Sequence, residues 1–303
     1  MRLVKNSVQR YIQKPGIDGM YEMIRDNAAV CYQTDVEKMK LSPKDFVHQV
    51  LLANAHTRPL EFGTVYLKLP AAYKDMFCDG QPSDTFLTYS KFRYVADWDN
   101  PENSCWYITT NFRCIMQGGW ETDEDAFEHN YNSNYLSIME KYWCEPTEYH
   151  YNRYCYGMIA SRGVTDDLRT HITQSSLCES TRFCNYFKGK FGNELTFIQP
   201  YWVSDENTEK YMNGTLEDGI DKSTLDELKN EETSYLRLAE LGLQPQQLKR
   251  VFPLGGKAEL RLCGFLDSWE NFFWRRCDSH ADPEAIIIAN MIKDDMIQNQ
   301  ILC

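Results

Sequence analysis

Helical and strand patterns are mixed along this chain of 303 residues, and they do not alternate regularly. Residues 17–32 repeat apolar side chains at helical spacing, with Asp18 as a candidate N-cap residue. Ser42-Pro43 is a typical helix start, because serine caps the first turn and proline suits the first helical position. Thr64–Leu69 alternates apolar and polar side chains, which is typical of a half-buried strand. The irregular mixture predicts an α+β fold.

Other segments carry the same two patterns. They predict further strands at 106–116, 154–160 and 195–203, and further helices at 126–142, 223–241 and 245–251. A last helix is expected to begin at Asp282-Pro283, with the aspartate as its cap residue. The side chains expected on the inner face of this helix are Ile288, Met291, Ile292 and Met296. No repeat and no low-complexity linker divides the chain.

The composition argues against several classes of protein. Apolar residues make up 43% of the chain and aromatic residues 14%, which is ample for a packed core. No apolar run reaches the roughly 18 residues of a membrane span, and residues 1–5 lack the apolar core of a signal peptide. We therefore expect a cytoplasmic protein without a membrane partner. The net charge of −12 argues against a nucleic-acid partner, yet a few converging arginines could still hold a small phosphorylated ligand.

The cysteines and histidines do not form metal-binding patterns. The 11 cysteines are scattered without a Cys-x-x-Cys pair, and the 6 histidines form no His-x-x-x-His pair, so no metal site is expected. Without a secretion signal the cysteines are expected to be reduced thiols. Cys31, Cys114 and Cys155 lie in apolar segments and are expected to act as small buried hydrophobic residues.

Residues 162–186 concentrate polar chemistry in a short stretch. His171, Glu179, Ser180 and Arg182 fall within 12 residues of one another. Charged and hydroxyl side chains this close together could hold a phosphate or polarise a ring carbonyl. Taken alone, the same composition also suits an ordinary solvated loop.

This stretch resembles the central motif of the flavin-dependent thymidylate synthases. The family carries Arg-His-Arg, then seven residues and a Ser, usually ending in Glu-Ser-x-Arg-Tyr. Here His171 and Ser180 stand at that spacing, and 179–183 resembles the tail. Residues 184–186, which follow directly, and then 190–198 resemble a longer-chain bacterial branch of the family.

Three further segments agree with the resemblance. Ala29–Tyr32 resembles the first helix of the family, and His56–Glu61 resembles its His-x-x-x-x-Glu-His element, with Phe62 in place of the last His. Residues 249–253, followed by 269–276 and 281–283, resemble its C-terminal signature. Because the matches occur in the order of the family, the chain is identified as a divergent member of that longer-chain branch.

The resemblance implies a fold and a reaction. The fold is one large α+β domain, 1–303, with a central mixed or antiparallel sheet flanked by helices and a family-variable insertion at about 70–150. The reaction is the reductive methylation of dUMP to dTMP, a step of nucleotide biosynthesis, with FAD, NADPH and methylenetetrahydrofolate. In such an enzyme the cofactors carry the difficult chemistry, while the protein orients and polarises. The resemblance also implies a homotetramer with active sites at subunit interfaces.

The resemblance further implies roles for individual residues. Ser180 and Arg276 are the implied catalytic residues, and they would bind dUMP together with Glu179, Arg182 and Arg250. The residues implied to contact the flavin cofactor are His56, Glu61, His171 and Asn271. From the residues alone, Arg250 and Arg276 could equally be ordinary surface or ion-paired arginines. Ser180 could be a cap or turn hydroxyl, and His56 a satisfied loop histidine.

The central motif departs from the family pattern at four positions. Thr170 and Ile172 replace both arginines of Arg-His-Arg, Asp166 stands where the longer branch often has His, and Cys178 where it often has Gln. Each lost cation removes charge-assisted hydrogen bonds that are worth about 1.5–3 kcal/mol. Two alternatives to the synthase are therefore kept. One is a degenerate nucleotide-binding homologue without flavin catalysis, and the other a related one-carbon modification of a pyrimidine nucleotide.

Overall fold

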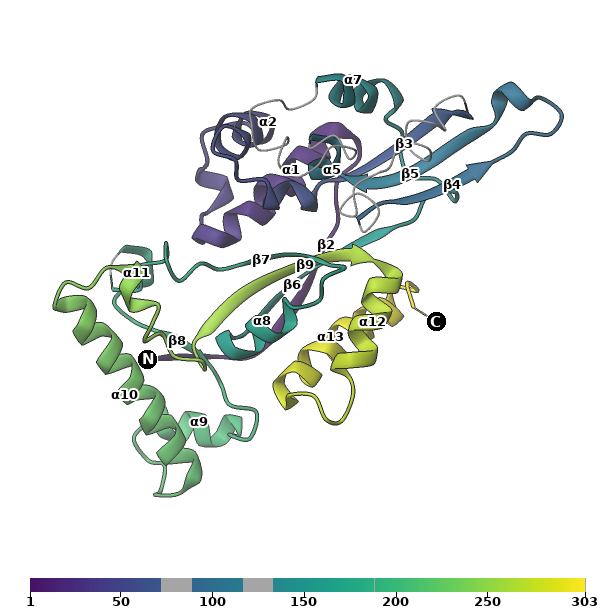
Figure 1. Cartoon of the computed structure of the whole chain (residues 1–303). Coiled ribbons are helices and arrows are strands. Elements are labelled where there is room, and N and C mark those ends of the chain that lie inside the picture. Colours follow the sequence, from purple (N-terminus) through teal and green to yellow (C-terminus); the bar gives the residue numbers. More distant parts are fainter. Residues whose placement is uncertain (72–88, 117–132, 188, 303) are drawn as a thin grey trace.

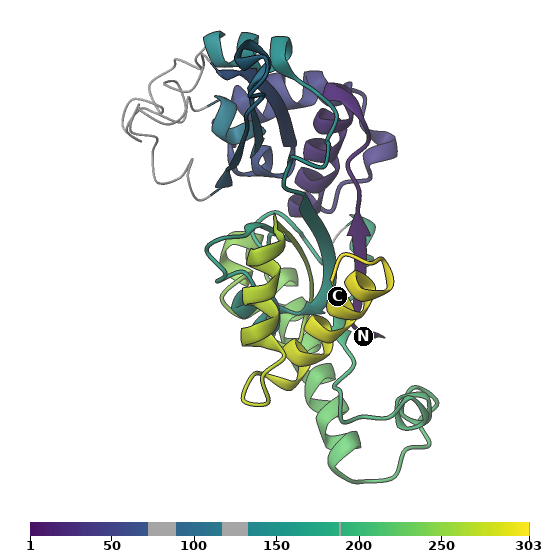
Figure 2. The ribbon, with the colours of Figure 1, turned by 90° about the vertical axis from the view of Figure 1, so that its right-hand side faces the viewer.

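The structure, a computed structural model, describes residues 1–71, 89–116, 133–187 and 189–302. These residues form two lobes, which lie one above the other in Figures 1 and 2. The small-sheet lobe comprises 16–71, 89–116 and 133–143. The central-sheet lobe comprises 1–11 and 153–302.

The central-sheet lobe is built on an antiparallel sheet of four strands in the order β2-β6-β9-β7. The strand bounds are β2 Ser7–Tyr11, β6 Arg153–Ser161, β9 Lys257–Phe265 and β7 Ser175–Cys178. On β9 the apolar Leu260 and Leu262 alternate with Lys257, Glu259 and Arg261, so the two sets lie on opposite faces of the sheet. The predicted α+β class and the antiparallel central sheet are confirmed.

Helices cover one face of the central sheet, below it in Figure 1. They are α8 Arg162–Leu168, α12 Leu266–Arg276 and α13 Pro283–Gln298. Their apolar side chains pack with Leu260 and Leu262 of β9 around the fully buried Trp269. The cap at Asp282 is confirmed, because its carboxylate accepts hydrogen bonds from the backbone N–H groups of Glu284 and Ala285 at 2.8 and 3.1 Å. On the predicted inner face of α13, Met291 is half-buried and the other three residues are fully buried.

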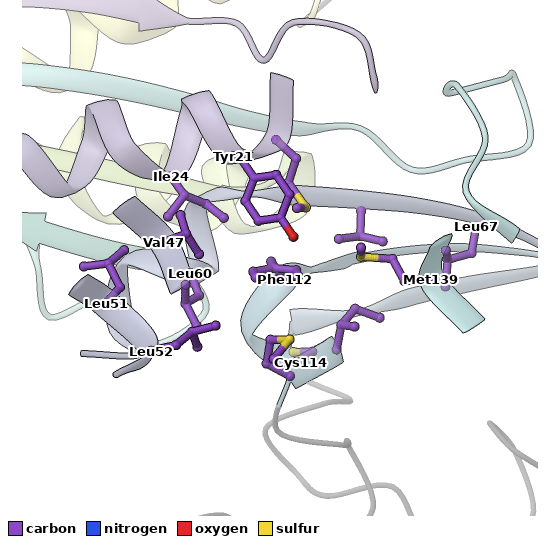
Figure 3. Close-up of a cluster of buried hydrophobic side chains, with 14 of the residues drawn as sticks. Tyr21, Ile24, Val47, Leu51, Leu52, Leu60, Leu67, Phe112, Cys114 and Met139 are labelled. Carbon is purple, nitrogen blue, oxygen red and sulfur yellow. The ribbon is translucent and has the colours of Figure 1, made fainter. Parts of the chain in front are cut away.

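The small-sheet lobe carries an antiparallel sheet in the order β3-β5-β4. Its strands are β3 Thr64–Pro70, β5 Cys105–Asn111 and β4 Lys91–Val95. Its helices are α1 Gly16–Ala28, α2 Pro43–Phe46, which continues as the π-helix η3 Val47–Leu52, α5 Phe112–Met116 and α7 Ser133–Tyr142. Figure 3 shows their shared core, in which Tyr21 and Ile24 of α1 meet Phe112 and Leu60.

A third group of elements lies beside the end of β9. Strand β1 Arg2–Val4 pairs in parallel with β8 Thr196–Ile198. The helices here are α9 Asp205–Met212, α10 Ile220–Glu240 and α11 Pro245–Leu248. Helices α9 and the lower part of α10 extend away from the rest of the molecule in Figure 2. No helix in the described part of the chain is both long and apolar enough to cross a membrane.

Several sequence predictions are confirmed and others need correction. The cap at Ser42 is present, since its hydroxyl accepts from the backbone N–H of Asp45 at 3.1 Å. Asp18 is not a cap residue, because α1 begins two residues earlier, after Pro15, and Asp18 lies in its first turn. The predicted strand at 106–116 ends at Asn111, where the side chain of this asparagine accepts from the backbone N–H of Cys114 and the chain turns into α5.

Other element bounds differ from the prediction in length. The strand predicted at 195–203 is limited to the three residues of β8. The helix predicted at 126–142 is described only from Ser133, and 126–132 lie outside the described residues. The nine cysteines of the described residues are free thiols. Cys114 and Cys155 are buried as expected, whereas Cys31 is half-buried.

Candidate functional site

A cavity of about 1500 Å³ lies between the two lobes. The small-sheet lobe lines it with residues from 28–34, 39–41 and 46–59. The central-sheet lobe lines it with residues from 162–183 and 249–254. Sites for single small molecules usually measure about 300–1,000 Å³, so this cavity has room for more than one small ligand.

The segment that follows β7 forms one wall of the cavity, and three elements hold it in place. The backbone N–H of Glu179 donates to the carbonyl of Glu259 on β9 at 2.8 Å, which extends the sheet by one residue. The next backbone N–H, of Ser180, donates to the carbonyl of Cys31 at 3.1 Å. Arg162 of α8 donates from Nη1 to the Glu179 carbonyl at 3.0 Å. The backbone at Glu179-Ser180 is therefore fixed from three sides.

Ser180 opens a turn that directs Arg182 to the mouth of the cavity. The Ser180 hydroxyl oxygen accepts from the backbone N–H of Arg182 at 3.4 Å, as expected of a turn residue. Its O–H hydrogen has no acceptor within the described chain and can donate to a ligand. The exposed Arg182 guanidinium lies over the Phe183 ring, 5.3 Å from its centroid, and this ring stacks on Tyr32 with 4.7 Å between centroids.

The charges that line the cavity are mostly positive. Its two carboxylates are already paired: Asp166 with Arg162 and Arg169, and Glu179 with Lys257. Five further lining cations pair with no carboxylate of the described residues, and these are Lys40, Arg58, Arg182, Lys249 and Arg250. In a chain of net charge −12, these unpaired cations create a local positive potential that favours anionic ligands.

His56 and Arg58 enter the cavity from the small-sheet lobe. His56 lies in the exposed turn between η3 and the 3₁₀ helix η4 Arg58–Phe62. Arg58 opens η4, and its Nη2 donates to the Ser176 hydroxyl on β7 at 3.1 Å. This contact joins the two lobes and leaves most of the guanidinium donors available to a ligand.

Glu61 lies outside the cavity lining. Its side chain is 5% exposed and forms an ion pair with Arg113 inside the small-sheet lobe. Its carbonyl accepts from Arg153 Nη2 of β6 at 2.9 Å. Glu61 therefore lies at a contact between the two lobes, and in the described structure it is apart from the other predicted site residues.

Three other predicted residues gather where the end of α8 meets α12. Arg276 donates from Nε to Nε2 of His171 at 3.0 Å and from Nη2 to the carbonyl of Asp167 at 2.7 Å. Asn271 is exposed on α12 and accepts from Arg275 Nε at 3.3 Å. None of the three lines the cavity. Helix α8 therefore separates two groups of predicted residues, with the cavity on one side and α12 on the other.

His171 is neutral in this environment. Burial, together with the neighbouring Arg276 and Arg275, lowers the pKa of its imidazole to about 4. Because Nε2 accepts from Arg276, the single ring proton must be on Nδ1. The ring packs against Phe272, with 4.9 Å between centroids.

The two positions that lack the motif arginines do not line the cavity. The Thr170 hydroxyl donates to the carbonyl of Asp167 at 2.7 Å, and it lies 3.3 Å from Arg276 Nη2. Ile172 is 82% exposed, and its carbonyl accepts from the Tyr89 hydroxyl at 3.0 Å. Neither residue supplies a cation to this surface.

Some cavity residues were missed by sequence reasoning. Arg58 and Lys249 lie inside quoted motifs, but nothing in those motifs indicates which side chains face a cavity. Lys257 lies outside the cavity lining and pairs with Glu179 of its wall; it belongs to an alternating pattern, 257–265, that is typical of a strand and could have been recognised. No cluster of three or more histidine, cysteine, aspartate or glutamate side chains suited to a metal ion occurs among the described residues.

Comparisons with known proteins give three results. A family model described as thymidylate synthase complementing protein matches residues 121–299. A search of curated proteins gives no match. Among solved structures, the chain is similar to thymidylate synthase X (ThyX) from Helicobacter pylori with FAD and dUMP. The sequence identity is 13%, the TM-score is 0.36, and the alignment covers 95% of this chain and 92% of that chain.

Proposed function

The chain belongs to the thymidylate synthase complementing protein family, and on that premise we propose that it methylates dUMP reductively to dTMP. Its co-reactants would be FAD, NADPH and methylenetetrahydrofolate. One observation carries the proposal: five cations that pair with no carboxylate in the described part of the chain line a single cavity of a strongly acidic protein. Both dUMP and FAD carry phosphate groups, and unpaired guanidinium groups are the side chains best suited to phosphate.

The residues of the cavity fit a mononucleotide together with part of a second phosphate-bearing ligand. Arg182, Lys249 and Arg250 lie on the central-sheet lobe and would hold the phosphate of dUMP. Lys40 and Arg58 lie on the opposite wall and would hold the phosphates of FAD. The combined volume of about 1500 Å³ accommodates both.

The protein would orient the nucleotide and polarise it. The Ser180 hydroxyl, fixed by the turn to Arg182, would donate its hydrogen to the pyrimidine ring. Tyr32 and Phe183 would cover the mouth of the cavity and exclude water from the bound ring. FAD, when bound, supplies the hydride chemistry. Arg276 and His171 would contribute from outside this cavity, since α8 lies between.

We also propose that a homotetramer completes the site. The predicted residues fall into two groups on opposite sides of α8, and a second subunit could bring the α12 group of one copy to the cavity of another. Two large apolar side chains beside the α12 group support a covered surface, with Ile172 82% and Trp274 73% exposed. Residues of both lobes line the cavity, which supports 1–303 as one domain. The insertion at about 70–150 stays a prediction.

A second candidate function is nucleotide binding without flavin catalysis. Thr170 and Ile172 supply no cation, and the guanidinium of Arg276 is occupied by His171 and the carbonyl of Asp167. These contacts favour a nucleotide-binding homologue, or an enzyme that attaches another one-carbon group to a pyrimidine nucleotide.

The test is binding and turnover on the purified protein. We expect FAD to bind, its absorbance to bleach when NADPH is added without oxygen, and dUMP to become dTMP when methylenetetrahydrofolate is present. Arg250→Ala should weaken dUMP binding about tenfold or more, the value of one charged contact. Arg237→Ala is the matched control, because this exposed arginine lies on α10 outside the cavity. Binding of dUMP without flavin reduction would contradict the synthase and support the second candidate.

A further inference from the structure

We propose that Lys257 and Tyr186 are positioning residues for the cavity wall at Ser180–Arg182, and that they act through the Glu179 carboxylate. The inference rests on the proposed function for the identity of the ligand. It also changes the role expected for Glu179, from a contact of dUMP to a buried anchor of the residues that contact it.

The Glu179 carboxylate is occupied at both oxygens. Oε1 accepts from the hydroxyl of Tyr186 at 2.7 Å, and Oε2 accepts from Nζ of Lys257 at 2.8 Å. The backbone N–H of Glu259 lies 3.3 Å from Oε2 as a third donor. The Glu179 side chain is 1% exposed, although the residue belongs to the cavity wall. A carboxylate with this set of donors has little capacity left for a ligand.

Lys257 reaches Glu179 because of the register of the central sheet. It is the first residue of β9 and lies on the face opposite the helices, together with Glu259 and Arg261. Gln33, which follows the 3₁₀ helix η1 Ala29–Tyr32, donates from Nε2 to Glu259 Oε2 at 2.9 Å, and its Oε1 lies 3.5 Å from Lys257 Nζ. The charges on β9 are thus tied to both walls of the cavity.

Tyr186 completes the anchor from the other end of the loop. It is 6% exposed, packs against Phe191 and Phe252, and directs its hydroxyl at Glu179. Burial and the Glu179 carboxylate raise the pKa of the Tyr186 phenol far above its usual range, so it stays a proton donor at every physiological pH. The loop from Glu179 to Tyr186 is therefore closed by a hydrogen bond between its two ends.

Loss of Lys257 would affect the cations of the cavity that pair with no carboxylate of the described residues. A buried carboxylate that loses its lysine is an isolated buried charge, which is very unfavourable, and a nearby cation relieves it. Arg182, three residues along the same cavity wall, pairs with no carboxylate of the described residues, whereas Arg162 already pairs with Asp166. Without Lys257, Glu179 would therefore turn into the cavity and compete there with the anionic ligand.

The experiment compares Lys257→Met with the double variant Lys257→Met, Glu179→Gln. We expect dUMP affinity, measured by calorimetry, to fall about tenfold or more in the single variant. In the double variant, in which no carboxylate can enter the cavity, affinity should return to within about threefold of the wild type. If the two variants lose affinity equally, Lys257 has only a structural role and the inference is wrong.

One further variant and one further ligand complete the binding experiment. Tyr186→Phe removes one hydrogen-bond donor to Glu179 without a change of charge. It should cause a smaller loss of dUMP affinity than Lys257→Met, and Glu179→Gln should again reverse this loss. Tyr186→Phe takes the place of Lys257→Met if the Lys257→Met protein does not fold. Pyrophosphate is titrated in parallel with dUMP. Wild-type binding of pyrophosphate but not dUMP would contradict the proposed function, while the same variants still decide the positioning role. Wild-type binding of neither probe would overturn both.

Discussion

Arg276 donates to Nε2 of His171, and this contact requires a neutral imidazole in the folded protein. Burial lowers the pKa of His171 to about 4, whereas in the unfolded chain it has its ordinary value of 6.5. Between these values the unfolded chain binds more protons, so the free energy of unfolding falls as the pH drops from about 6.5 to about 4. Below about 4 both states carry the proton and this contribution is lost completely.

We predict that His171→Gln removes this part of the pH dependence. The amide oxygen of glutamine can accept from Arg276 but does not titrate. Urea unfolding of both proteins at pH 7 and pH 4.5 is the measurement, and the difference between them isolates His171 from the carboxylates. Equal losses of stability in the two proteins would contradict a neutral buried His171.

The second prediction at the scale of single residues concerns Arg58. It reaches the cavity from the small-sheet lobe, and among the described residues its side chain donates one hydrogen bond, to Ser176. Arg58→Ala should weaken FAD binding about tenfold and change the melting temperature little, since one partly exposed hydrogen bond is lost. Flavin fluorescence quenching measures the affinity, with Arg237→Ala as control. A loss of dUMP affinity larger than the loss of FAD affinity would mean that Arg58 holds dUMP and not FAD.

Sequence reasoning found part of the candidate site. His56, Glu179, Ser180, Arg182 and Arg250 were predicted from the resemblance, and all line one cavity. The role of Glu179 could not be read from a motif, because its partners Lys257 and Tyr186 reach it only through the pairing of β7 with β9 and the closure of a loop. A contact of this kind depends on the register of the sheet, which no local pattern encodes.

At the scale of elements, α8 is the boundary of the site. Its Arg162 and Asp166 are one helical turn apart, pair with each other and face the cavity. The carbonyl of Asp167, the next residue, points to Arg276 on the other side. The loop after α8, with Thr170 and Ile172, therefore lies outside the cavity lining, and its Thr170 hydroxyl lies beside Arg276 of α12.

We predict that Thr170→Arg combined with Ile172→Arg raises FAD affinity, because the two cations would meet the flavin phosphates where a second subunit brings its cavity to this surface. Both side chains are exposed in the single chain, so two longer cations can reach a ligand held between subunits. Each restored charge-assisted bond should improve affinity by about tenfold. A pair of lysines at the same positions is the control for charge alone, since lysine lacks the bidentate fork. No gain from either pair would mean that this surface does not meet the flavin.

The elements themselves were predictable where a local signal was present. Helix α13 follows its Asp282 cap and α10 its long periodic pattern, and both begin within three residues of the prediction. The apolar run at 106–116 has no local signal for the change from β5 to α5, which depends on the tertiary packing of Phe112. Strand β7 was not predicted, because it is only four residues long and mostly polar, and because its partner β9 lies about 80 residues away along the chain.

At the scale of the whole molecule, the two groups of predicted residues lead to the prediction of a homotetramer. We expect light scattering at micromolar concentration to give four times the chain mass of 35.6 kDa. Ile172→Glu should shift the mass towards smaller species, because a charge buried at an interface is unfavourable. Ile12→Glu is the matched control: this isoleucine is 71% exposed and lies outside both groups. A monomer mass for the wild type would contradict both the assembly and the shared site.

The contrast between an acidic molecule and a cationic cavity affects how fast a nucleotide arrives. At an ionic strength of about 0.01 M the Debye length is about 30 Å, so a dianion that approaches a molecule of charge −12 is repelled before it reaches the mouth of the cavity. Within the mouth it meets the unpaired lysines and arginines and is attracted. Added salt screens the first effect more than the second, because exposed, distant charges are screened most. Moderate salt should therefore raise the association rate of the nucleotide, and it should raise the dissociation rate less. In basic proteins, which attract the same ligands from a distance, salt lowers the association rate instead.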